Sequence, residues 1–196
     1  MLMASVGRYP GDDASPLDLN RLADFYRDAA HRAAASIRLG DPMSAAPMRM
    51  LAIHSIELNL SSFLLATGLS RVDIRKLGHD LAARVDLATG KGLGLRQRTI
   101  AHVRVVARDR EYLIARYGPD CLSGLPQTNR VLATLEEVAA KVSRALRKPH
   151  CTSERAPLGT SSQRKIATSK SRDLPTLCQG FMSQTARPQS SSHTRK

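Results

Sequence analysis

Hydrophobic residues recur with helical spacing along most of the chain, and the longest apolar run covers residues 51–69. This spacing predicts five helices, over residues 16–39, 47–67, 79–89, 96–117 and 128–146, with a short turn or helix at 70–76. Most of these segments end near a glycine or a proline, as helices commonly do. No stretch has the alternating pattern of a strand. We therefore expect an all-α fold, an up-and-down bundle of about five helices.

The second predicted helix carries two apolar stripes. The wide stripe consists of Ala52, Ile53, Ile56, Leu60, Phe63 and Leu64. The narrow stripe consists of Leu51, Leu58 and Leu65. Because a helix with one wet side needs a single apolar stripe, the second one indicates either the central helix of the bundle or a subunit interface. His54, Glu57 and Ser61 lie between the stripes on one polar strip.

Arg110 falls inside the apolar stripe of the helix predicted at 96–117, so it must reach solvent or find a carboxylate. Glu57 is the predicted partner, which gives a polar core network of His54, Glu57 and Arg110. An acid–base pair or a ligand pocket is the alternative for His54 and Glu57. Asp80 complements the dipole of the third helix in its first turn, and His79 beside it is interpreted as a second organiser of that helix start, with a functional role as the alternative for His79.

The net charge of +13 is divided between two kinds of sequence. Residues 1–148 hold 22 Lys/Arg and 15 Asp/Glu, whereas residues 149–196 hold 8 and 2. Residues 149–196 also contain 15 Ser/Thr, which predicts a disordered basic tail. We expect a flexible leader at 1–15, the bundle at 16–148 and the tail at 149–196. The basic balance is compatible with nucleic-acid binding, but solubility alone explains it as well.

The remaining composition bears on location and ligands. The three cysteines, Cys121, Cys151 and Cys178, lack metal-binding spacing, so no metal is expected and a reducing cytoplasm fits best. The apolar run contains His54 and Glu57, which argues against a membrane span. No phosphate-binding glycine loop is present, and nothing in the sequence calls for a cofactor.

Three segments together resemble the HEPN superfamily of small helical-bundle proteins. They are AIHSIELNLSSFLLATG at 52–68, KLGHDLAARVDLA at 76–88 and EYLIARYGPDCLSGLPQ at 111–127, and a last amphipathic helix follows them. The likeness covers roughly residues 17–147. It implies a homodimer formed through an apolar helix face, association with a nucleotide or RNA, and in some members a nucleotidyltransferase partner protein.

Nuclease members of that family carry an arginine, four to six intervening residues and a histidine, paired across a dimer. Arg96 and His102 match this spacing, although Gln97 departs from the usual residue after the arginine. Histidine can move a proton of the 2′-hydroxyl, and arginine can hold the charged phosphorane. Six helical steps place two residues about 120° apart, so Arg96 would have to lie in the loop before the helix.

Two functional hypotheses follow. The first is a non-catalytic binding or interaction module associated with a nucleotide or RNA. The alternative is a metal-independent, toxin-like endoribonuclease that uses Arg96 and His102. Whether the protein is an enzyme is left open by the sequence.

Overall fold

The computed structural model describes residues 9–147, which form seven α-helices and two short 3₁₀ helices, with no strand among these residues. The helices are α1 (Pro16–Ala34), η1 (Pro42–Ala45), α2 (Ala46–Ala66), α3 (Arg71–Lys76), α4 (Leu81–Gly90), α5 (Gln97–Arg108), α6 (Glu111–Tyr117), η2 (Leu122–Gly124) and α7 (Thr128–Arg147). The predicted all-α class is confirmed. The predicted tail at 149–196 and the first eight residues of the leader lie outside the described residues.

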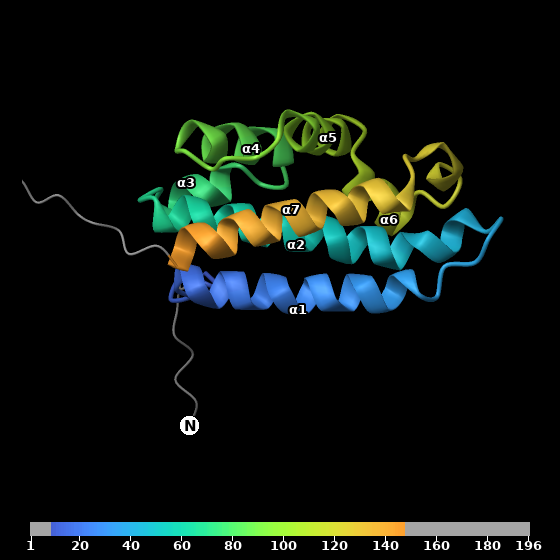
Figure 1. Cartoon of the computed structure of the whole chain (residues 1–196), viewed down its shortest axis with the longest axis horizontal. Helices are drawn as coiled ribbons and strands as arrows, with labels where there is room; N and C mark the ends of the chain where they lie inside the picture. Colours follow the sequence, from blue (N-terminus) through green and yellow to red (C-terminus); the bar gives the residue numbers. More distant parts are fainter. Residues whose placement is uncertain (1–8, 148–196) are drawn as a thin grey trace, which may run out of the picture. The chain divides into compact units, whose positions relative to one another are not determined.

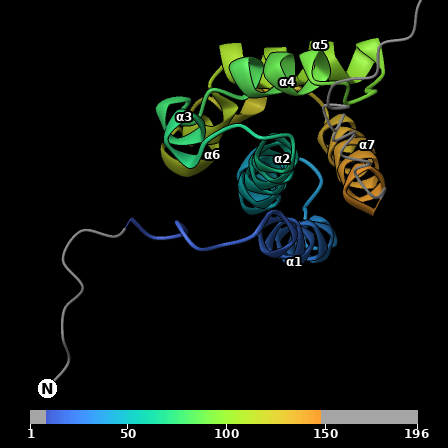
Figure 2. The same cartoon turned by 90° about the vertical axis from the view of Figure 1, so that its left-hand side faces the viewer.

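Helix α2 is the centre of the bundle. It packs against α1, α7, α6 and α4, and Figure 2 shows it nearly end-on with these helices around it. Figure 1 shows α1, α2 and α7 lying lengthwise along one another, with α4 and α5 over them. Every residue of the predicted wide stripe is buried, and the narrow stripe is half-buried. Helix α2 is therefore the central helix of the bundle, which is one of the two explanations for its second stripe, and the subunit interface stays a prediction.

The segment predicted as one helix at 96–117 is two helices, because α5 ends at Arg108 and α6 begins at Glu111. Arg110 joins them with a φ of 51°, a left-handed conformation that is uncommon for residues other than glycine. The break places Arg110 on the surface, although the helical spacing put it in the apolar stripe, and it leaves Tyr117 76% exposed. A smaller difference is that α1 ends at Ala34, before the predicted end at residue 39, whereas the segment at 70–76 forms the short helix α3, as one of its two predicted forms.

Helices α1 and α2 are joined by hydrogen bonds as well as by apolar contacts. Asn59 is fully buried, and its side chain accepts a hydrogen bond of 2.9 Å from Asn20. Two serines of α2 also donate to main-chain oxygens of α1, Ser55 to Ala23 at 2.7 Å and Ser62 to Pro16 at 2.6 Å. Because buried polar groups are costly unless paired, these three bonds fix how the two helices meet. Among the described residues, no helix has the length and hydropathy to cross a membrane.

Candidate functional site

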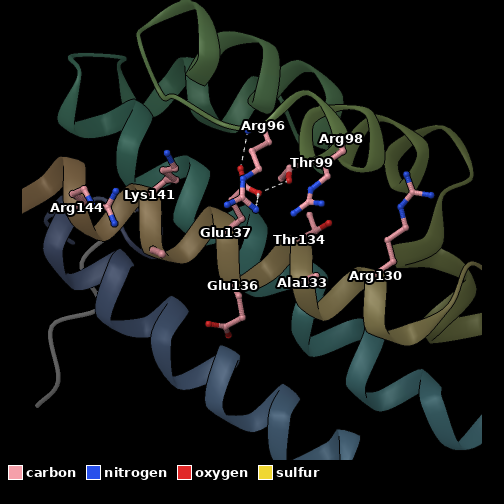
Figure 3. Close-up of a pocket in the computed structure, with 11 residues that line it drawn as sticks. Arg96, Arg98, Thr99, Arg130, Ala133, Thr134, Glu136, Glu137, Lys141 and Arg144 are labelled. Carbon is pink, nitrogen blue, oxygen red and sulfur yellow. Dashed lines mark hydrogen bonds and ion pairs between the residues drawn. The ribbon is translucent and has the colours of Figure 1, made fainter.

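A groove of about 850 Å³ runs between α5 and α7 (Figure 3). Its lining residues are Arg96, Arg98, Thr99, Arg130, Ala133, Thr134, Glu136, Glu137, Ala140, Lys141 and Arg144. Five of them are cationic and two are acidic. In Figure 3 the cationic side chains come from both helices, two from the start of α5 and three from α7. A groove with this lining attracts anions.

Glu137 holds the start of α5 in place. Its carboxylate accepts a hydrogen bond of 2.7 Å from the backbone N–H of Arg96 and one of 2.8 Å from the Thr99 hydroxyl. Burial opposes ionisation, but the hydrogen bonds from Arg96 and Thr99 outweigh it and lower the pKa of Glu137. Arg96 is the N-cap residue of α5 and has no side-chain cap of its own, so this carboxylate caps the helix from α7.

Glu136 is turned away from the groove. It lies 2.7 Å from Nε2 of His31 and 3.7 Å from Arg27, both on α1, and Figure 3 shows its side chain pointing away from α5. The remaining cations of the groove form no ion pair with another described residue; these are Arg98, Arg130, Lys141 and Arg144. The positive charge of the groove is therefore largely uncompensated.

The predicted catalytic pair, Arg96 and His102, is divided between the groove and the core. The Arg96 side chain is 65% exposed and lies in the groove, 3.7 Å from Glu137. His102 is 1% exposed, and its Nδ1 is hydrogen-bonded at 2.7 Å to the hydroxyl of Thr134. Since Thr134 lines the groove and His102 does not, the imidazole lies beneath the groove.

His102 is a neutral core side chain at physiological pH. Burial, assisted by the charges of Arg130 and Arg49, lowers the pKa of His102 to about 4. Its Nε2 is buried and has no hydrogen-bond partner among the described residues. A general acid or base needs a pKa near the working pH and a path to substrate, and this imidazole has neither.

Glu57 pairs with His79 and Arg84, so the predicted contact with Arg110 is replaced by a different one. The Glu57 carboxylate lies 3.1 Å from Nδ1 of His79 and 3.4 Å from Arg84. Arg84 also donates to the Ser61 hydroxyl at 2.9 Å and is 4% exposed. Arg110 reaches solvent instead, because the break before α6 takes it off the apolar face.

The other predicted residues have separate surroundings. His54 is half-buried, its ring meets that of Tyr26 edge-on at 4.4 Å, and burial lowers its pKa. Asp80 caps α4 by accepting a hydrogen bond of 2.9 Å from the N–H of Ala83, as an organiser of the helix start would. His79 contacts Glu57 and Tyr112 rather than the helix start.

A buried ion pair between Arg49 and Glu111 was missed by the sequence reasoning. The two side chains are 4% and 0% exposed and lie 2.9 Å apart, and Arg49 also donates to the carbonyl of Pro126. Burial raises the pKa of Glu111 and lowers that of Arg49, and each charge opposes the shift of the other. The pair ties α2 to α6 and to the segment before α7. An arginine in the first turn of a long apolar helix was the available signal.

Comparisons with known proteins leave the family open. No protein-family model, curated protein or solved structure matches this chain. The HEPN resemblance therefore stays a prediction that rests on the three quoted segments, as do the homodimer and the nucleotidyltransferase partner. Within the described residues no group of three or more His, Cys, Asp or Glu is placed to hold a metal ion.

Proposed function

We propose that this chain is a non-catalytic RNA-binding module that holds the phosphate backbone in the α5–α7 groove. The observation that carries the proposal is the uncompensated positive charge on two facing helices. Arg130 and Arg144 are 14 residues apart on α7, which at 1.5 Å per residue spans about 21 Å. A cationic run of this length suits an extended polyanion better than a single phosphate.

The composition of the groove favours contacts to the backbone of the RNA over contacts to its bases. None of the lining residues is aromatic, so the groove offers no ring on which a base can stack. Arginine and lysine contacts to phosphate position a strand without reading its sequence. We therefore expect binding with little sequence preference and strong dependence on salt.

The position of His102 supports binding without cleavage. The imidazole is 1% exposed beneath the groove, and its pKa of about 4 keeps it neutral at physiological pH. Arg96, the other member of the predicted pair, is exposed in the groove and is available to contact a phosphate. In this proposal Arg96 binds and His102 supports the core, and no proton transfer is assigned to either.

Fluorescence anisotropy with a labelled single-stranded RNA of mixed sequence tests the proposal on the full chain. The double variant Arg98→Gln, Lys141→Gln removes one cation from each wall of the groove. The control Arg21→Gln, Arg32→Gln removes the same charge from exposed positions of α1. If both groove cations contact phosphates, the slope of log K against log salt falls in magnitude by about 1.4, or about 0.7 per contact.

If the groove variant and the α1 control weaken RNA binding equally, the affinity comes from the net charge of the protein and not from the groove. The segment at 149–196 is the same in both variants, so its own charge cancels from the comparison. Incubation of the RNA with wild type and His102→Asn in the presence of EDTA tests the absence of catalysis. Cleavage that wild type performs and His102→Asn does not would overturn the non-catalytic assignment.

A further inference from the structure

A second pocket, of about 510 Å³, opens beside the C-terminal end of α5, away from the cations at its N-terminal end. Its lining includes His79, Arg104, Arg108, Arg110 and Tyr112. These residues come from the turn before α4, from α5 and from the first turn of α6 and the residue before it. The pocket therefore joins three arginines to a histidine and a phenol.

The imidazole of His79 has a fixed orientation. Its Nδ1 lies 3.1 Å from the carboxylate of Glu57, whose side chain is 15% exposed, and Arg84 supports that carboxylate from the core. An ionised carboxylate only accepts hydrogen bonds, so Nδ1 carries the shared proton. The other ring nitrogen, Nε2, is then the atom that remains for a ligand. The side chain of His79 is 50% exposed, so a ligand can reach it.

The break between α5 and α6 brings Arg110 and Tyr112 to this histidine. The rings of His79 and Tyr112 lie 5.3 Å apart at 37°, and Arg110 lines the same pocket two residues before the tyrosine. Arg110 adopts its left-handed conformation and is exposed, so packing of the core does not explain why an arginine occupies this position. Strained backbone of this kind is concentrated at functional sites.

Arg110 is the cation of the pocket whose charge is available. Arg104 lies 2.7 Å from Asp86, and Arg108 lies 2.7 Å from Asp109. Arg110 forms no ion pair with any residue in the described part of the chain. The carboxylate of Asp80, which also lines the pocket, accepts the hydrogen bond that caps α4. An anion entering the pocket would thus meet Arg110 and the Nε2 of His79.

We propose that this pocket binds a single phosphate group of a small phosphomonoester, with the Arg110 guanidinium on two of its oxygens and Nε2 of His79 on a third. Arginine alone can satisfy a planar carboxylate through two parallel hydrogen bonds. A phosphomonoester presents three terminal oxygens, and its second ionisation falls near pH 6, so one oxygen can share a proton with an imidazole. The combination of an arginine and an oriented histidine therefore selects phosphate over carboxylate.

Titration of the full chain with inorganic phosphate, followed by long-range ¹H–¹⁵N NMR of the histidine rings, tests this proposal. The His79 signals, assigned from the His79→Gln variant, should shift and reach saturation. Arg110→Gln should weaken binding by at least about tenfold, because tenfold is about the value of one charged hydrogen bond and the guanidinium is proposed to make two. Arg32→Gln, which removes an exposed cation of α1 outside both the groove and the pocket, is the matched control and should leave the phosphate affinity unchanged.

Three results would overturn the proposal. They are a shift that grows linearly without saturation, an equal shift with sodium chloride at the same ionic strength, and an unchanged affinity in Arg110→Gln. In the free protein the neutral His79 ring should carry its proton on Nδ1, and the opposite tautomer would contradict the orienting role of Glu57. The result is independent of RNA binding, because the groove and pocket variants alter different residues.

Discussion

The buried imidazole of His102 makes the stability of this protein depend on pH over a defined range. Its pKa is about 4 in the folded chain, against 6.5 for an unperturbed histidine. Above pH 6.5 the ring is neutral in both states, so its full contribution to stability is present. As the pH falls from 6.5 toward 4, the unfolded chain takes up a proton that the folded chain excludes, and the free energy of unfolding decreases.

The size of this decrease follows from the two pKa values. One pKa unit corresponds to about 1.4 kcal/mol, so the gap between 6.5 and about 4 amounts to about 3.5 kcal/mol, of which about 3 kcal/mol is lost by pH 4, where the folded chain is half protonated. Domains of this size are stable by about 5–15 kcal/mol, so the loss is a large part of the total. Well below pH 4 both states are protonated, and His102 causes no further decline.

The matched variant is His102→Asn. The asparagine amide occupies nearly the position of Nδ1, so it can keep the hydrogen bond to Thr134, but it cannot take up a proton. Urea unfolding followed by circular dichroism, at a series of pH values from 7 to 4, gives the free energy of unfolding for both proteins. Carboxylates, including Glu111, titrate in both proteins, and their effect cancels from the difference between them.

Wild type should lose about 3 kcal/mol more than His102→Asn over this range. The variant is expected to be less stable at pH 7, because it leaves a cavity where the rest of the ring was. The two curves should therefore approach one another as the pH falls. Parallel curves would refute the reasoning, since they would mean that His102 titrates alike in the folded and unfolded chains.

Three further predictions concern stability and are measured by the same urea unfolding at pH 7. Glu111→Gln should lower the free energy of unfolding by about 3 kcal/mol, because it leaves Arg49 buried without a counter-charge. Adding Arg49→Met should recover much of this loss. A double variant no more stable than the single variant would contradict the prediction. Arg110→Gly should raise the free energy of unfolding by about 0.5–1 kcal/mol, because glycine adopts the left-handed conformation without strain, and it should also weaken phosphate binding. A destabilised variant would show that the backbone at Arg110 is not strained. Asn59→Ala should lower the free energy of unfolding by about 2 kcal/mol, because it leaves the side-chain amide of Asn20 without its acceptor. A loss no larger than that from substituting an exposed residue would mean that water takes the place of the lost hydrogen bond.

The fold was predictable where the spacing of apolar residues decides burial. The wide stripe of α2 is buried as predicted. The break between α5 and α6 was not predictable, because Asp109 and Arg110 include no glycine or proline and the apolar spacing continues across them. Tertiary packing rather than local preference sets that boundary.

The candidate sites were predictable only in part, because long-range partners are not encoded in spacing. Glu57 was expected to pair with Arg110 and pairs with Arg84 instead, because in a chain rich in arginine the spacing could not distinguish the two. The groove cations of α7 went unrecognised, although Arg130, Lys141 and Arg144 follow helical spacing on its polar face. Arg96 and His102 were chosen by spacing in sequence, which contains no information about the burial of the imidazole.

The hydrogen bonds between α1 and α2 have a consequence for the register of these helices. The α1 face is rich in alanine, and Ala23 and Ala30 are fully buried, so smooth surfaces of this kind could slide along one another. Displacement by one turn, about 5.4 Å, would break the Asn20–Asn59 bond and leave the two serine hydroxyls of α2 facing different atoms. A single buried asparagine is known to select one register in paired helices. In this protein the buried Asn59 also sets which side of α1 faces outward. Leu17 and Phe25 lie on that side and remain exposed.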